Sequence, residues 1–314
     1  MPPSAVAAPI AESAPDLPPT ADEPAPISIK AKIVTVIAVF VPLAGTVAAI
    51  ASVWGWGFTW ADLGILFGCY LATGLGITVG FHRLFTHKAF ETARPLEFVW
   101  GVLGSMAIQG PLLKWVALHR VHHQYSDQEL DPHSPHGHGN GVWAVVKGFW
   151  HAHVGWAFNP DPVPIDRYIT DLRKRTLPRV IHALFPLWVA IGLAIPAALG
   201  GLLSLSWAGV FRGLLWGGLV RVFLVHHVTW SVNSVCHLWG SRPYPEKDRS
   251  RNNWLFGLLA LGEGWHNNHH AFPTSARHGL KWWQVDTSYM TIWAMEKLGL
   301  AWKVRLPAAQ HAMA

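Results

Sequence analysis

Long stretches without charged side chains constrain this chain more than any other feature. Residues 33–53 and residues 63–81 contain no Asp, Glu, Lys or Arg, and each is about long enough to cross a hydrocarbon core of ~30 Å as a helix. A third apolar stretch, residues 180–225, is too long for one crossing and is divided near residues 204–207. An all-α membrane protein is therefore predicted. Its four transmembrane helices are expected at about residues 33–53, 63–81, 180–203 and 208–230.

The two ends of the chain differ from this apolar body. Residues 1–27 are rich in Pro and Ala and contain acidic but few large apolar side chains. Such a composition cannot bury enough surface to offset the entropy lost on ordering. We predict a disordered tail at residues 1–27, a single domain at 28–306 and a short tail at 307–314.

Basic residues predict the orientation of the spans. Lys and Arg are frequent in residues 82–179 and 231–314 and absent from the two short turns at 54–62 and 204–207. Because cytoplasmic loops carry an excess of basic residues, both termini and the segment 82–179 are predicted to be cytoplasmic. The net charge of +6 then reflects topology and contact with anionic lipids, and we expect no nucleic-acid partner.

A further uncharged run, residues 98–113, is shorter than the others and is interrupted by Gly110 and Pro111. Its length favours a re-entrant or interfacial segment over a fifth span. If it crossed the bilayer, the histidines at 82–87 and at 119–123 would lie on opposite faces of the membrane. They could not then share a metal site.

Histidine is unusually abundant for so apolar a chain, with 19 residues. Many occur in the motifs HRLFTH, HRVHH, NSVCH and WHNNHH, all predicted on the cytoplasmic side. On a helix, positions i, i+3 and i+4 share a face, so each HxxHH motif presents neighbouring imidazoles on one surface. The candidate metal ligands are His82, His87, His119, His122, His123, His237, His266, His269 and His270.

The number of imidazoles indicates two metals, since a single zinc site usually has four ligands. His82 and His87 are five residues apart, which corresponds to about 140° around an α-helix. We therefore expect these two to reach different metals. Imidazole binds zinc, copper, iron and nickel alike. The apolar surroundings, which could admit a hydrocarbon, favour iron, because breaking an unactivated C–H bond requires O2 chemistry.

The remaining histidines lack this register. A polar cap formed by chance is the alternative for any single motif, but the three motifs HRLFTH, HRVHH and WHNNHH on one predicted side make it a poor explanation for the whole set. His226 and His227 are expected to have packing roles. Loop positions, or positions behind the ligands, are expected for His133, His136, His138, His151, His153, His278 and His311.

These motifs resemble the membrane fatty-acyl desaturase family, in particular its Δ9 stearoyl-type branch. The similarity extends from about the second span to Leu306 and is carried by GITVGFHRLFTH, WVALHRVHHQYSDQELDPH, TWSVNSVCHLWG and GEGWHNNHHAFPTSARHG. It implies four spans and a cytoplasmic helical cap in which the nine histidines hold two irons, with O2 as co-substrate. Asn233 matches the family position that approaches one metal through water.

The resemblance also implies a substrate tunnel. Tyr70, with Gly74 one turn further on, matches the position near the methyl end that limits chain length, and Gln109, Trp115 and Thr229 match residues at the tunnel's bend. Ordinary core packing is the alternative for each. The segment QGPLLKWVALHRVHH is more similar to cyanobacterial and plant-type members, some of which act on acyl groups esterified in lipids. Acyl-CoA and acyl-lipid are both candidate substrates.

The expected function is O2-dependent, cis-selective Δ9 desaturation of a saturated acyl chain, in unsaturated fatty acid biosynthesis at a bacterial inner membrane. The chain has no flavin or nicotinamide fingerprint and no haem or iron–sulfur ligand set. Electrons are therefore expected from a ferredoxin or cytochrome b5-type donor with its reductase. Arg173, Lys174 and Arg175 are candidates for docking that donor, and a solvated or lipid-facing basic cluster is the alternative.

Other functions share part of this pattern. A di-iron membrane hydroxylase of alkyl or fatty-acyl chains would use the same histidines but insert oxygen. A zinc-dependent membrane hydrolase, or a metal-binding membrane protein without catalytic activity, is an alternative from another functional class. The products and the metal content distinguish these alternatives.

Overall fold

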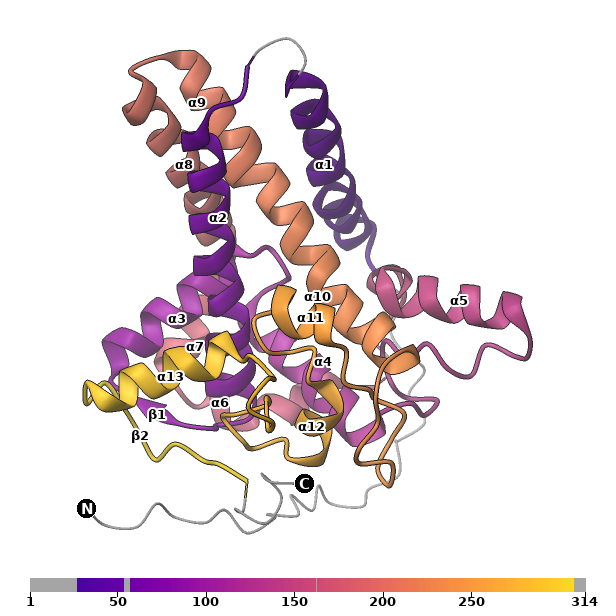
Figure 1. Cartoon of the computed structure of the whole chain (residues 1–314). Helices are drawn as coiled ribbons and strands as arrows, with labels where there is room; N and C mark the ends of the chain where they lie inside the picture. Colours follow the sequence, from indigo (N-terminus) through magenta and orange to yellow (C-terminus); the bar gives the residue numbers. More distant parts are fainter. Residues whose placement is uncertain (1–26, 54–56, 162, 308–314) are drawn as a thin grey trace.

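The computed structural model describes residues 27–53, 57–161 and 163–307. Within these residues the regular elements are helices and one two-stranded sheet, joined by loops. Long helices rise from a cap of shorter helices and loops (Figure 1). Except for residues 27 and 307, the predicted tails lie outside the described residues.

Four helical stretches of the described chain are long and apolar enough to cross a bilayer, which confirms the predicted number of spans. The first and third are single helices, and the other two are composite. They are α1 (Ile29–Val53); α2 (Trp60–Leu75) with η1 (Gly76–Thr86); α8 (Phe185–Ser204); and α9 (Trp207–Gly213) with η4 (Leu214–Val220) and α10 (Arg221–Leu238).

The span boundaries differ from those predicted. The second and fourth stretches continue past residues 81 and 230 to Thr86 and Leu238, because each helix extends beyond its apolar part into the cap. The third begins at Phe185, not near residue 180, since residues up to Ala183 belong to the preceding helix α7 (Thr176–Ala183) and Leu184 separates the two helices. The extensions of the second and fourth stretches carry histidines into the cap.

Charged groups within the spans are satisfied by protein atoms, as expected where water is scarce. Asp62 caps the first turn of α2 by accepting from the Thr59 backbone at 2.9 Å, and it forms an ion pair with Arg212 of α9 at 3.3 Å. Arg221 is fully buried and donates to the carbonyls of Met106 (2.6 Å) and Gly192 (2.8 Å). These contacts join the second, third and fourth spans.

The segment 98–113 is not one element. It covers most of α3 (Arg94–Met106), a turn, and the start of α4 (Leu112–Tyr125). The turn contains Ile108 at φ +61° and Gly110 at φ +99°, which are not helical conformations, and Pro111 is the N-cap of α4. α3 packs against η1 so closely that a Cβ on Gly76 would lie 2.3 Å from the Gly104 nitrogen.

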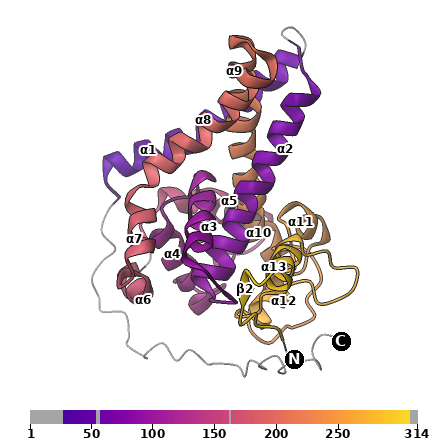
Figure 2. The ribbon, with the colours of Figure 1, turned by 90° about the vertical axis from the view of Figure 1, so that its left-hand side faces the viewer.

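The cap surrounds the ends of η1 and α10. In Figure 2, α3 and α4 lie on one side of the second span and α11, α12 and α13 on the other. The strands β1 and β2 pair antiparallel, with Glu91 opposite Trp302. The remaining elements are β1 (Glu91–Thr92), α5 (Val142–His153), η2 (Gly155–Phe158), η3 (Ile165–Ile169), α6 (Thr170–Arg173), α11 (Trp254–Leu259), α12 (His266–Ala271), α13 (Thr287–Lys297) and β2 (Ala301–Trp302).

Candidate metal centre

The histidines of the four motifs, far apart in sequence, converge inside the cap. Their ligand nitrogens form two groups, and within each group these atoms lie within 4.8 Å of one another. The first cluster consists of His82, His87, His119, His123 and His269. The second cluster consists of His122, His237, His266 and His270. All nine predicted ligands are thus brought together.

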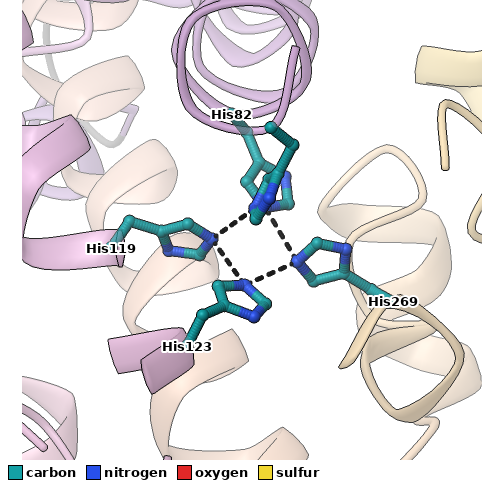
Figure 3. A group of neighbouring side chains, drawn as sticks. His82, His119, His123 and His269 are labelled. Carbon is teal, nitrogen blue, oxygen red and sulfur yellow. Dashed lines mark hydrogen bonds between the residues drawn. The ribbon is translucent and has the colours of Figure 1, made fainter. Parts of the chain in front are cut away.

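The nitrogen spacing in the first cluster fits a shared metal ion. The Nε2 atom of His269 lies 3.0 Å from that of His82 and 2.9 Å from that of His123, and His123 and His119 are 3.0 Å apart (Figure 3). Two nitrogens that bind one ion at about 2.1 Å, at right angles to each other, lie about 3 Å apart. This geometry gives the first cluster the donor arrangement of a metal site.

The second cluster has similar spacing and lies beside the first. The Nε2 atoms of His122 and His270 are 3.3 Å apart, and those of His266 and His237 are 3.1 Å apart. The rings of His123 and His270, which belong to different clusters, have centroids 4.5 Å apart. Each HxxHH motif therefore divides its histidines between the two clusters, and a pair of neighbouring metals fits the residues present.

The predicted separation of His82 and His87 is wrong, because both belong to the first cluster and their ring centroids are 4.8 Å apart. The prediction assumed α-helical geometry. The helix instead has π geometry at η1, and the backbone N–H of His87 donates to the backbone carbonyl of His82 at 3.1 Å. Because a π turn contains more residues than an α turn, positions five apart come onto one face.

Buried carboxylates lie behind four of the histidines, each next to a ring Nδ1. A carboxylate that accepts from Nδ1–H leaves the Nε2 lone pair directed at the metal. None of these acids was predicted from the sequence, although Asp127 and Asp131 lie within eight residues after the HRVHH motif. The pairs are His82–Glu263 (2.7 Å), His122–Asp131 (3.0 Å), His237–Asp127 (3.1 Å) and His270–Asp248.

Electrostatics keep four of the clustered histidines and Asp131 in the charge states that metal binding requires. Burial lowers the pKa of His119, His123, His266 and His269 well below the ordinary value, so the rings are neutral and their lone pairs are available. Burial alone would raise the pKa of Asp131, but the adjacent His122 outweighs it and holds the pKa below its usual range. The carboxylate is therefore ionised and accepts hydrogen bonds.

A narrow cavity reaches the clusters from the membrane helices. Its lining includes His82 and His119 of the first cluster and His266 of the second. Tyr70, Gly74, Trp115, Thr229 and Asn233, all predicted site residues, line it as well. Gln109 is not in the lining, but its Nε2 donates to the Thr229 hydroxyl at 2.8 Å and its Oε1 accepts from the Trp115 indole at 3.4 Å.

A larger cavity of about 490 Å³ lies between α2 and α8. Its lining contains none of the clustered histidines, and it includes Gly64 and Gly68, which are exposed on the outer surface of α2. Such an apolar groove on a spanning helix faces lipid. The smaller cavity is the candidate substrate site, because the metal clusters form part of its wall.

Comparison with known proteins identifies this arrangement. The family model described as fatty acid desaturase matches residues 58–302. This chain belongs to the fatty acid desaturase family. It is therefore a membrane oxidoreductase that acts on fatty acyl chains, as the sequence motifs predicted.

Three relatives illustrate the range of the family. The chain is 44% identical to a hex-5-enoyl-[acyl-carrier protein] acetylenase of Moorena producens, over 86% of this chain and 85% of the relative. It is 41% identical to an sn-1 stearoyl-lipid 9-desaturase of Anabaena variabilis (79% and 86%). It is 40% identical to a palmitoyl-monogalactosyldiacylglycerol delta-7 desaturase of Arabidopsis thaliana (80% and 64%). These relatives share chemistry on acyl chains but differ in bond position and carrier.

The other described histidines of this desaturase lie outside the two clusters. His226 is within 3.1 Å of the Ala107 carbonyl, and His227 is 2.9 Å from His153, which are the packing roles expected for this pair. His278 contacts buried Arg83 at 3.0 Å, and Arg83 also donates to Glu263, the partner of His82. His311 lies outside the described residues.

The basic cluster at residues 173–175 offers less free charge than the sequence suggested. Arg173 forms an ion pair with Asp166 at 2.6 Å, and Arg175 forms one with Glu97 at 2.6 Å. These carboxylates offset two of the three positive charges that were predicted to dock an electron donor. The desaturase therefore offers an acidic partner less attraction at this position.

Proposed function

We propose that this desaturase introduces a cis double bond at Δ9 of a saturated fatty acyl chain, using O2 and two irons held by the nine clustered histidines. The observation that carries the proposal is the narrow cavity that runs from the membrane helices to the paired clusters. The active site would face the cytoplasm of a bacterial cell, with a ferredoxin or cytochrome b5-type donor and its reductase supplying electrons.

The donor set supports two metals of a kind that binds imidazole. When bound, a di-iron centre supplies the O2-dependent oxidising chemistry that an unactivated C–H bond requires. The protein's own part is to hold the ligands. Glu263 and Asp131 each fix one ring of a different cluster, through His82 and His122.

Selection of the methylene pair depends on position, because methylenes along a saturated chain are almost identical chemically. Trp115 stacks on His119, with ring centroids 5.1 Å apart, and so places an apolar wall beside the first cluster. The hydrogen bond between Gln109 and Thr229 would fix the shape of the bend. A bent cavity of fixed depth determines both the bond position and the cis geometry.

The contacts at the far end of the cavity support a role for Tyr70 in limiting the length of the acyl chain. The Tyr70 hydroxyl donates to the Leu259 carbonyl at 2.7 Å, which holds the phenol ring across the gap between α2 and α11. A Cβ on Gly74 would lie 3.0 Å from Leu261, so the glycine preserves space next to Tyr70. We place the methyl end of the substrate here.

The bond position rests on the similarity to stearoyl-lipid 9-desaturases. Relatives named for lipid-bound, CoA-bound and carrier-protein-bound substrates occur at similar identity. We favour acyl-lipid or acyl-CoA as the substrate. The acetylenase relative supports a second candidate, removal of two further hydrogens from a chain that is already unsaturated.

Expression in a host that lacks desaturases tests the function. We expect the host's lipids to gain a fatty acid that has lost two hydrogens, with a cis double bond at carbon 9, since the cavity fixes which methylenes meet the clusters. Gas chromatography with mass spectrometry of derivatised lipids gives the bond position, and separation by lipid class gives the carrier. Gain of one oxygen atom would instead identify a hydroxylase, and a triple bond would identify an acetylenase.

Substitution of Tyr70 tests the chain-length role. Tyr70→Ala should shift the products towards longer acyl chains, because removal of the ring deepens the cavity. Tyr70→Phe is the matched control, since it removes the hydrogen bond to Leu259 but keeps the ring, and its profile should stay close to that of the wild type. An unaltered chain-length profile in Tyr70→Ala would contradict the assignment.

A further inference from the structure

The loop that follows α10 reaches the second metal cluster from the protein surface. Asp248 contacts Nδ1 of His270. The backbone nitrogen of the next residue, Arg249, donates to Asp127 at 2.8 Å, and Asp127 in turn lies 3.1 Å from Nδ1 of His237. Two neighbouring loop residues therefore contact the second cluster: Asp248 holds His270 directly, and Arg249 holds the carboxylate that contacts His237.

The same loop carries positive charge that is not neutralised by ion pairs. Within the described part of the chain, none of its four cations has a carboxylate oxygen within 4.0 Å. Instead they contact neutral groups, as in the 3.3 Å hydrogen bond from Lys247 to the Ala271 carbonyl. The cationic loop, as we name residues 242–251, contains four cations, Arg242, Lys247, Arg249 and Arg251, and two acids, Glu246 and Asp248, so that its net charge is +2 (four minus two). Asp248 is engaged with His270.

We propose that the cationic loop is the docking surface for a small acidic protein that carries one electron. The inference rests on the proposed function, which requires an external reductant. Complementary charge speeds encounter and orients the partner. The cationic loop is a better candidate than residues 173–175, where Asp166 and Glu97 already offset two of the cations.

The contacts also provide a short route for the electron. From the Arg249 backbone it leads through two hydrogen bonds, by way of Asp127, to His237 of the second cluster. Electron tunnelling weakens steeply with distance, so a donor seated on this loop has a favourable path. Two reduced carriers each release one electron, and these with two protons, one O2 and two substrate hydrogens give two waters and one C=C bond.

The position of the loop favours a protein partner over lipid headgroups. In Figure 1 the orange segment after α10 descends to the base of the cap, on the side away from the long helices. Lys247 and Arg249 are exposed there. By contrast, Arg175 directly precedes α7, which leads into the spanning helix α8.

The double substitution Lys247→Glu/Arg249→Glu tests the docking surface. The hydrogen bond to Asp127 persists, because it uses the Arg249 backbone. With reduced [2Fe–2S] ferredoxin as the probe, we expect the KM for ferredoxin to rise about tenfold at low salt. Increasing salt should raise the KM of the wild type towards that of the variant, because salt screens the attraction between the charges. Turnover driven by dithionite provides the reference rate that does not depend on docking.

Lys174→Glu/Arg179→Glu is the matched control, since both residues are exposed and the charge change is the same. It should leave the KM for ferredoxin unchanged. An unchanged KM in the loop variant, or an equal rise in both variants, would overturn the proposal. Binding of oxidised ferredoxin, measured directly, decides the docking question without catalysis. Absence of product from the wild type with dithionite would count against the proposed function instead.

Discussion

Replacement of His122 or His269 by alanine is expected to abolish the desaturated product. His269 has its Nε2 atom within 3.0 Å of two other histidines of the first cluster, and the Nε2 atom of His122 in the second cluster lies 3.3 Å from that of His270. Loss of either ring removes a ligand from one metal. Because the proposed chemistry requires both metals, damage to one cluster should be enough to stop it.

Both variants should still insert into the membrane, since the spanning helices satisfy their own backbone hydrogen bonds in lipid. Fatty acid analysis of the expressing host and metal analysis of the purified protein are the measurements. His227→Ala is the control, because this histidine pairs with His153 outside both clusters. Full activity in His122→Ala or His269→Ala would contradict the assignment of that histidine as a metal ligand.

The number of spans and the HxxHH motifs were predictable because both depend on local periodicity. An apolar helix must have a minimum length to cross a bilayer, and residues i, i+3 and i+4 share a face wherever a helix forms. His119, His122 and His123 lie within one α-helix, α4. Their convergence with His269 and His270 follows from the family resemblance and not from any pattern within either motif.

Other parts of the site depend on tertiary contacts that leave no local pattern. The π geometry of η1 brings His87 back to His82, and packing between η1 and α3 accompanies it, with Gly76 and Gly104 in close contact. Asp248 reaches His270 from a loop 22 residues earlier in the chain. No spacing rule predicts either contact, because each requires the folded cap.

Arg83→Met is expected to destabilise the protein severely. Arg83 is fully buried and donates to Asp286 at 2.9 Å and to Glu263 at 3.1 Å. Removal of the guanidinium leaves two buried carboxylates without their cation, which costs about 3–5 kcal/mol. For a domain of this size we expect Tm, measured on the detergent-solubilised protein, to fall by about 10 °C. Arg173→Met, which breaks an exposed ion pair with Asp166, is the control and should cost at most about 1 kcal/mol.

Two causes of that loss of stability, unpaired charge and lost packing, can be separated by experiment. If unpaired charge is responsible, neutralising the two acids in the Arg83→Met background, with Glu263→Gln and Asp286→Asn, should restore part of the lost Tm. In Asp286→Asn the amide oxygen can still accept from the backbone N–H of Tyr289, as the Asp286 carboxylate does. Activity should not return with stability, because Glu263→Gln gives His82 a neutral amide acceptor in place of the carboxylate. If Tm does not recover in these variants, Arg83 acts chiefly through its shape.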